Sequence, residues 1–333
     1  MKKLKVYYFP PEDRKNGYKN PYSINFLESI KPYFRIVNKR SQIYKILPKG
    51  LNLAFMSCSA NIYIISWLES ICFGKIALLQ FISSIIALNI LKIRKVKIIW
   101  IYHNIHPHQG NNRLSKAIQT FLFNNSSLII SHSIEASNYA KKFAKCPVIY
   151  KCHPIKKIET KKYNNIIDHD IFIWGSILPY KGILEFIIEH RKRQSQLTVY
   201  ILGKCNDITL SKSINEACNQ YIIYENRIAD FSEIASNIQK SKFILFPYIG
   251  DCISSSGALI DTIAMNGIPV GPNKGAFIDL AKENLCITYN NYNELFKILS
   301  ENKLVNHNNN KSFIENNSWE KFGTFLQESI KNL

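Results

Sequence analysis

Three stretches of this chain combine residue types and spacing that suit chemistry, and the first is a polar turn. Residues 254–257 read Ser254-Ser255-Ser256-Gly257 and lie between an apolar run that stops at Pro247 and a segment with apolar residues at helical spacing. This order predicts a strand, a loop and the start of a helix. Small residues let an anion approach the free N–H groups of a first helical turn, where the dipole also favours negative charge. The turn therefore suits a phosphate, although a serine N-cap on an ordinary helix has the same pattern.

The second stretch, Gly175 to Gly182, follows a predicted strand at 171–174 and opens a helix. It combines a flexible backbone with one cation, Lys181, at the helix start. Its glycine spacing fits neither a P-loop nor a dinucleotide fingerprint. A lone lysine here would usually be solvated, but beside the 254–257 turn it would neutralise a diphosphate.

The third stretch begins with His103, which ends a predicted buried strand at 96–102. An imidazole of near-neutral pKa suits proton transfer or a hydrogen bond to a sugar hydroxyl. His106 and His108 follow, but Pro107 makes their spacing irregular for a metal site. We expect the chain to lack an Asp-x-Asp element that would hold a divalent ion on a nucleotide diphosphate, and we therefore expect a mechanism without a metal.

The charge of the chain is concentrated in its first half. The formal net charge of the 333 residues is +19. Residues 1–153 hold 23 Lys and Arg against 5 Asp and Glu, whereas residues 154–333 hold 20 against 19, so the halves carry +18 and +1. The basic half is expected to face something anionic, either a membrane with acidic lipids or nucleic acid. A basic face that serves solubility alone is the simpler alternative.

Cysteine usage and the apolar tracts bear on location. The eight cysteines show no Cys-x-x-Cys spacing, which favours reduced thiols, and the first residues do not resemble a signal peptide. We therefore expect a cytoplasmic protein. The longest apolar tract, residues 76–91, is shorter than the roughly 20 residues that cross a bilayer. A basic cluster follows it, so both a core helix and an interfacial helix remain open.

Strands alternate with helices along the chain, which predicts two doubly wound parallel sheets of an α/β protein. A length of 333 residues with 46% hydrophobic content suits two domains. We expect domains at 1–153 and 171–317, a linker at 154–170, and a final helix within 318–333 that packs back across the linker. Strands are predicted at 5–9, 34–37, 51–56, 62–67, 96–102, 127–131, 148–152, 171–174, 198–202, 221–224, 243–246 and 286–289, and a loop at 306–317.

Several motifs together resemble the GT-B glycosyltransferases, most closely glycosyltransferase family 4 and its relatives in bacterial polysaccharide synthesis. They are Gly-x-x-x-x-x-Lys-Gly at 175–182, Thr-Ile-Ala-Met-Asn-Gly-Ile-Pro-Val at 262–270, and a histidine that ends a strand of the first half. The resemblance covers nearly the whole chain and implies two Rossmann-like domains facing a cleft. It also implies transfer of a sugar from a nucleotide diphosphate donor, held by the second domain, to an acceptor on the first.

The resemblance assigns roles by position. Gly175, Ser176 and Lys181 would hold the pyrophosphate, Ser254, Ser255, Ser256 and Gly257 would meet sugar and phosphate, Thr262 would lie near the ribose, His103 by the donor sugar, and Asn20 and Tyr22 on the acceptor side. The chain departs from the family at three of these positions. Ser254 and Thr262 replace two glutamates of the family, and Ser176 replaces an arginine; Asp251 and Asp261 are nearby carboxylates.

These observations predict a cytoplasmic glycosyltransferase at the inner-membrane surface, which extends a lipid-linked oligosaccharide for a capsule, exopolysaccharide or O-antigen. We expect the nucleotide sugar as its donor and neither a further cofactor nor a nucleic-acid partner. An inverting reaction would require a base, for which Glu69, His103 and His108 are the candidates.

Three alternatives stay open at this point. One is another GT-B enzyme, such as a nucleotide-sugar epimerase, and the second is a scaffold without catalysis, because the glutamates are replaced. The third is a basic nucleic-acid-binding protein. The aromatic residues argue against that alternative, because most lie in apolar strands rather than among the basic residues as a stacking surface.

Overall fold

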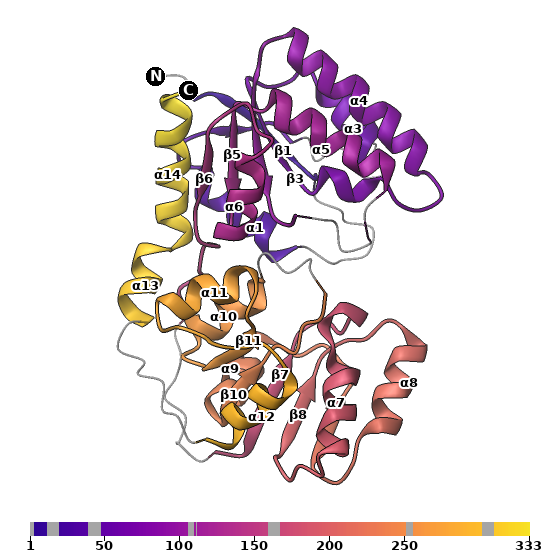
Figure 1. The fold of residues 1–333 in the computed structure, drawn as a ribbon. Coiled ribbons are helices and arrows are strands. Elements are labelled where there is room, and N and C mark those ends of the chain that lie inside the picture. Colours follow the sequence, from indigo (N-terminus) through magenta and orange to yellow (C-terminus); the bar gives the residue numbers. More distant parts are fainter. Residues whose placement is uncertain are drawn as a thin grey trace. The chain divides into compact units, whose positions relative to one another are not determined.

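Two six-stranded sheets form the framework of the chain, and all of their strand pairs are parallel (Figure 1). The structure is a computed structural model that describes residues 3–11, 20–38, 48–105, 110, 112–158, 167–250, 256–301 and 310–333. The chain divides into unit 1, Met1–Cys152 with Trp319–Leu333, and unit 2, His153–Ser318. The predicted fold class, two doubly wound parallel sheets, is confirmed.

Unit 1 has the strand order β2-β1-β3-β4-β5-β6. Its strands are β1 (Lys5–Phe9), β2 (Arg35–Ile36), β3 (Ile62–Ser66), β4 (Lys97–Tyr102), β5 (Leu128–Ser131) and β6 (Val148–Tyr150). Its helices are α1 (Pro21–Ile30), α3 (Lys49–Met56), the 3-10 turn η1 (Leu68–Ile71), α4 (Ala77–Ile93), α5 (Arg113–Asn125), α6 (Ile134–Lys141) and α14 (Trp319–Lys331).

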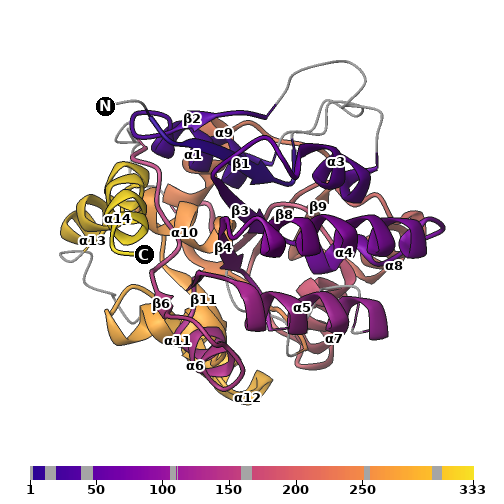
Figure 2. The same ribbon diagram turned by 90° about the horizontal axis from the view of Figure 1, so that it is seen from above.

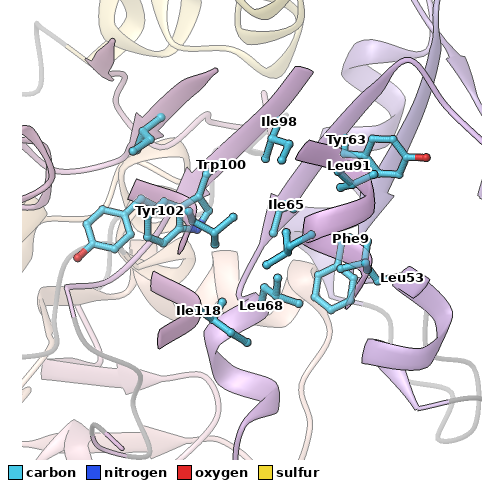
Figure 3. Packing of buried hydrophobic residues seen from close by; sticks show 14 of the residues in the cluster. Phe9, Leu53, Tyr63, Ile65, Leu68, Leu91, Ile98, Trp100, Tyr102 and Ile118 are labelled. Atoms are coloured by element: carbon cyan, nitrogen blue, oxygen red, sulfur yellow. The ribbon is translucent and has the colours of Figure 1, made fainter. Parts of the chain in front are cut away.

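Alternate strand residues of unit 1 build two cores, one on each face of the sheet. Tyr63 and Ile65 of β3 pack with residues of α3, α4 and α5 (Figure 3). Their neighbours Ile62 and Ile64 pack instead with α1 and α14. Figure 2 shows α3, α4 and α5 together on one side of β3 and β4, with α14 on the other. Both faces of the sheet are therefore covered, as expected for a parallel sheet.

Unit 2 has the strand order β12-β11-β10-β7-β8-β9. Its strands are β7 (His169–Trp174), β8 (Val199–Leu202), β9 (Ile222–Glu225), β10 (Ser241–Leu245), β11 (Pro269–Pro272) and β12 (Ile287–Tyr289). Its helices are the 3-10 turn η2 (Pro179–Lys181), α7 (Ile183–Lys192), α8 (Ile208–Ala217), α9 (Phe231–Gln239), α10 (Gly257–Ala264), α11 (Gly275–Lys282), α12 (Tyr292–Ser300) and α13 (Asn310–Asn316). The order reverses between β7 and β10, which makes their carboxyl ends the switch point where such sheets bind ligands.

Two of the predicted elements are wrong. The strand predicted at 51–56 belongs to α3, in which Leu53 and Met56 are buried one turn apart against α4. A short apolar run does not distinguish a strand from a helix by periodicity alone. The loop predicted at 306–317 contains α13, whose residues are mostly polar.

The C-terminal helix α14 belongs to unit 1 and packs on α1. Phe322 contacts Phe26 with ring centroids 5.6 Å apart. Gly323 brings the two backbones together, because a Cβ at this position would lie 2.1 Å from the carbonyl oxygen of Ser29. The apolar stripe of the last predicted helix thus completes a core that begins near the N-terminus of the chain.

Candidate functional site

The loops at the switch point of unit 2 bring together two of the stretches that the sequence singled out. Gly175 to Gly182 follows β7, and the segment that begins at Phe246 follows β10. The backbone N–H of Ile249 donates to the carbonyl oxygen of Tyr180 at 2.9 Å, so the two loops are in direct contact. The switch point is therefore a built site rather than two separate surface loops.

Glycines allow this close approach. Gly182 has φ +62°, and a Cβ there would lie 2.1 Å from the carbonyl oxygen of Pro247. Gly175 has φ +98°. Its carbonyl oxygen contacts Gly203, where a Cβ would lie only 1.9 Å from that oxygen. Only glycine combines the left-handed backbone with this absence of bulk. Both turns fix the backbone on either side of Lys181.

Lys181 is a buried cation at the end of η2, with 8% of its surface exposed. Its Nζ lies 5.5 Å from the ring centroid of Tyr248, a cation–π contact. Burial lowers the pKa of Lys181 below its ordinary value. Among the described residues, its ammonium makes no ion pair and no hydrogen bond. A buried charge without a counter-charge is costly, so this position suits an anionic ligand.

The start of α10 lies beside the same loop. Ser256 is its N-cap: the Oγ accepts from the backbone N–H of Leu259 at 3.4 Å and lies 3.2 Å from the Tyr248 hydroxyl. The helix end that we expected to be open is therefore capped at one amide, whereas those of Gly257 and Ala258 make no hydrogen bond to described residues. Ser254, Ser255 and Asp251 lie outside the described residues.

His153 is a neighbour of this helix start that the sequence did not reveal. Its Nδ1 donates to the carbonyl oxygen of Pro154 at 2.9 Å, which assigns the proton to that nitrogen. Its Nε2 lies 4.0 Å from where a Cβ of Gly257 would be. Burial lowers the pKa of His153 to about 4, so the ring is neutral near pH 7. Only the folded chain brings residues 153 and 257 together.

Three further residues near the switch point make no hydrogen bond to Lys181 or Tyr248 that the structure shows. Thr262 is fully buried, and its Oγ1 accepts from Nε1 of Trp174 at 3.0 Å. Its hydroxyl supports the end of β7 from within the core. Ser176 is exposed on the loop. Burial raises the pKa of Asp261 to about 7, an effect that the positive charge of Lys156 opposes.

A pocket of about 360 Å³ continues the site across the ends of β10, β11 and β12. Its lining includes Tyr248, Lys274, Tyr289 and Asn290. The Nζ of Lys274 donates to the carbonyl oxygen of Gly250 at 3.4 Å, which places a second cation at this edge of unit 2. Aromatic side chains can stack on a flat ring of a ligand, and amide groups can hydrogen-bond its polar atoms, so the pocket suits a polar ligand that contains a ring.

In unit 1, His103 lies in a cluster of rings at the carboxyl ends of the strands. It is buried, stacks on Trp67 with centroids 4.0 Å apart, and meets Tyr22 edge-on at 4.7 Å. His132, which the sequence did not reveal, donates from Nδ1 to the carbonyl oxygen of Lys151 at 2.8 Å. In the neutral ring, its Nε2 then accepts from the Tyr22 hydroxyl at 2.7 Å. These two contacts orient the His132 ring within the cluster.

Glu69 lies in different surroundings, within η1. Its side chain is 3% exposed, and Oε2 accepts no hydrogen bond from the described residues. Burial raises the pKa of Glu69 from its ordinary 4.5 to about 7. Its charge acts on Cys72 and Tyr102, which belong to the core on the α4 side of the sheet. A carboxyl group of this kind is a candidate base with a suitable pKa.

The remaining candidates are local or undescribed. The Oδ1 of Asn20 accepts from the backbone N–H of Tyr22 at 3.0 Å, so Asn20 caps α1. His106 and His108 lie outside the described residues. No group of three or more His, Cys, Asp and Glu in the described part of the chain is arranged to hold a metal ion.

The expectation that the chain lacks an Asp-x-Asp element is wrong, because Asp168-His169-Asp170 is one, at the start of β7. Asp168 pairs with Lys240 at 2.9 Å, and Asp170 pairs with Lys242 at 2.6 Å. Because the element lies at the amino end of β7, it is at the edge of the sheet opposite the switch point. Its carboxylates therefore do not contribute to the candidate site.

The structure is similar to those of solved glycosyltransferases. Anabaena HepE, in complex with UDP-glucose, has a TM-score of 0.69 at 11% identity, over 99% of this chain and 100% of that chain. A glycosyltransferase from Rickettsia africae gives 0.65 at 13% identity over 99% of each chain. The trehalose-6-phosphate synthase OtsA gives 0.68 at 10% identity, over 100% of this chain and 99% of that chain.

No protein-family model matches the sequence. No curated protein matches it either. Membership in glycosyltransferase family 4 therefore stays a prediction from the motifs. The two parallel six-stranded sheets and the similarity along the whole chain show the fold: the chain is a two-domain α/β protein of the GT-B type.

Proposed function

We propose that the chain is a glycosyltransferase that takes a sugar from a nucleotide diphosphate donor. The observation that carries the proposal is Lys181, a buried cation without a counter-charge at the switch point of unit 2. The amides of Gly257 and Ala258 begin a helix beside it. The charge and position of these groups suit a pyrophosphate, and the solved structure of HepE, which shares the fold, contains UDP-glucose.

In the proposed reaction, these groups act on the leaving nucleotide diphosphate. Negative charge accumulates on its distal phosphate as the bond to the sugar breaks. The Lys181 ammonium and the first amides of α10 would stabilise that charge without reorganising, because the glycines already fix their positions. Gly175 and the exposed Ser176 would contact the pyrophosphate from the same loop as Lys181, and Ser254, Ser255 and Ser256 would contact sugar and phosphate.

The residues of unit 1 take the acceptor and the proton in this proposal. If the reaction inverts the anomeric carbon, a base must take the proton of the attacking hydroxyl. Glu69, with its raised pKa, His103 and His108 remain the candidates. Tyr22 would contribute to the acceptor side through the ring cluster that it shares with His103.

We further propose a lipid-linked oligosaccharide as the acceptor, extended at the cytoplasmic face of the membrane during capsule, exopolysaccharide or O-antigen synthesis. The charge of +18 on the first half of the chain supports this acceptor, because a polyprenyl diphosphate lies at an anionic surface. The donor supplies the reacting group, and the proposed mechanism uses neither a metal nor a further cofactor.

A thermal-shift panel of UDP, GDP, CMP and dTDP sugars tests the donor site. A ligand at 100 times its Kd stabilises the folded state by about 2.7 kcal/mol, so the correct nucleotide identifies itself. Lys181→Met keeps the volume of the side chain and removes its charge, and we expect it to abolish the shift. Lys192→Met, an exposed lysine at the far end of α7, should retain it. An unchanged shift in Lys181→Met would contradict the donor site.

Nucleotide release separates a glycosyltransferase from an epimerase of the same fold. A transferase with a lipid-linked acceptor should release free nucleotide diphosphate faster when a membrane lipid extract is present. An epimerase should convert the sugar without any such dependence on lipid. A basic nucleic-acid-binding protein would show neither activity and would bind DNA or RNA with a strong dependence on salt.

A further inference from the structure

Helix α4 presents bulky apolar side chains to solvent along one face. Leu78, Leu79, Ile82, Ile86 and Ile93 are between 47% and 79% exposed. Their spacing of three, four and seven residues places them on one side of the helix. Phe55 of the neighbouring helix α3 is 67% exposed as well. We name these six residues the α4 face.

The buried side of α4 is unusually small and polar. It contains Ser83, Ser84 and Ala87, together with Leu88 and Leu91. Both serine hydroxyls donate to carbonyl oxygens of the preceding turn, at 2.7 Å each. A helix of a water-soluble protein normally buries its large apolar residues and exposes its polar ones. In α4, two serines are buried instead, while five bulky apolar side chains are exposed to solvent.

Close packing on α3 explains why the small residues lie inside. A Cβ at Gly50 of α3 would lie 2.5 Å from the carbonyl oxygen of Gln80 and 2.8 Å from the hydroxyls of Ser83 and Ser84. The two helices therefore meet over small side chains. The bulky residues of the α4 face do not take part in this contact. An exposed apolar patch of this kind marks a surface that binds another molecule.

Basic residues border the α4 face at both ends. Lys75 precedes the helix, Lys92 lies in its last turn, and Arg94, the C-cap, and Lys95 follow it. The sequence contains no Asp or Glu between Glu69 and Glu135. None of the helices that the structure describes is suited to span a bilayer, by length and apolar content together. An apolar helix face with basic ends and no acidic residues is typical of a helix that lies in an interface with anionic lipids.

We infer that the α4 face docks the protein on an anionic lipid bilayer, with the helix parallel to the surface. A second copy of the chain is disfavoured as the occupant, because pairing two such faces in either direction would bring basic ends together. The inference deepens the proposed function and rests on it only for the identity of the acceptor, which such a surface would present.

Vesicle binding tests the inference with the full chain. Wild-type protein should cosediment with vesicles of phosphatidylcholine and phosphatidylglycerol, and much less with phosphatidylcholine alone. The triple variant Leu79→Gln/Ile82→Gln/Ile86→Gln should bind at least about tenfold more weakly. Its control is Ile188→Gln/Ile208→Gln/Ile223→Gln in unit 2, where the isoleucines are equally or more exposed. The control should bind like the wild type.

Charge and insertion depth are tested separately. Lys75→Gln/Lys92→Gln should weaken binding to the anionic vesicles by about fivefold per charge, and Lys192→Gln/Lys297→Gln should not. A tryptophan at Ile86 should be quenched by lipids with brominated acyl chains, whereas one at Ile208 should not.

Several results would overturn the inference. They are no binding by the wild type, equal loss in the control triple, or a dimer in sedimentation equilibrium that the α4 triple variant abolishes. Because the α4 triple variant leaves the donor site intact, its nucleotide thermal shift should be unchanged. Vesicle binding without any nucleotide shift would uphold the docking face and reject the proposed function, and the converse would reject the docking face alone.

Discussion

Two buried ionisable side chains make no ion pair with the residues that the structure describes. Lys181 lies at the switch point of unit 2, and Glu69 lies in η1 of unit 1. Burial shifts the pKa of each toward its neutral form. Such groups cost folding free energy, so they mark the positions where a ligand or a proton transfer compensates for that cost.

Glu69→Gln tests whether the raised pKa of this carboxyl destabilises the fold. Below pH about 4.5 both folded and unfolded states hold the neutral acid, and as pH rises toward 7 the unfolded state ionises first. Above pH 7, the variant should therefore be more stable by up to about 3 kcal/mol, with no gain near pH 4. Urea unfolding at both pH values measures the difference.

Glu28→Gln is the control for this prediction, because Glu28 is an exposed carboxylate of the same unit. Its stability should change little at either pH. A gain for Glu69→Gln that is equal at both pH values would reject the pKa as its cause. If Glu69 is also the base, the variant loses transfer activity, and the acid limb of the wild-type pH profile lies near 7.

Thr262→Val tests whether Thr262 serves the donor or the core. The change removes the acceptor of the Trp174 indole N–H and leaves that donor buried, at a cost of about 1–3 kcal/mol. Nucleotide affinity should stay within about twofold of the wild type, because the hydroxyl does not face solvent. The double variant Trp174→Phe/Thr262→Val, which removes both partners, should recover part of the stability. A tenfold loss of affinity with normal stability would restore the ribose role.

At the residue level, the sequence predicted groups that are charged or lie at a strand end. The sequence singled out Lys181 and His103 because each follows a strand, where ligands of parallel sheets gather. Tyr248, His132 and His153 were missed because their partners are distant in sequence. The ribose role of Thr262 was predicted from the resemblance to the family. Its burial against Trp174 could not be predicted in this way, because it depends on how the rest of the sheet packs.

At the level of elements, the loop that leaves β7 depends on Gly182. Gly182→Ala would force a left-handed backbone on alanine and place its Cβ against Pro247. We expect a loss of about 3 kcal/mol or more from strain and overlap together, and loss of nucleotide binding because Lys181 moves.

The control separates strain from overlap. Gly74 has φ +85° and nothing within 4 Å of a Cβ, so Gly74→Ala should cost only about 1–2 kcal/mol. Chemical unfolding and the nucleotide thermal shift measure both variants. Equal destabilisation would mean that contact with the loop after β10 does not matter.

The alternation of strands and helices could be predicted from the sequence because buried strands are nearly continuous apolar runs, as in Ile62–Ser66 and Lys97–Tyr102. For residues 76–91 the sequence left open a core helix and an interfacial helix. The packing of Gly50 against Ser83 and Ser84 turns the side with the two serines inward, which no periodicity of the sequence could decide. Residues 51–56 were misread for a related reason, because a short apolar run fits both periods.

At the level of the whole chain, charge divides the two units. Unit 1 holds 25 Lys and Arg against 7 Asp and Glu, and unit 2 holds 18 against 17, so they carry +18 and +1. The proposed lipid face lies in the first and the proposed donor site in the second. Two different ligands should therefore act on two different parts of the chain.

Hydrogen exchange tests this division directly. A nucleotide diphosphate that binds should slow exchange at Gly175–Gly182 and in the first turn of α10, because ligand contacts remove the opening of those amides. Anionic vesicles should slow exchange in α4 and α3 and leave the switch point of unit 2 unchanged. The triple variant of the α4 face is the control. It should still show slower exchange with the nucleotide, but no longer with the vesicles. Protection of α10 by vesicles alone would place lipid, rather than a nucleotide, at Lys181.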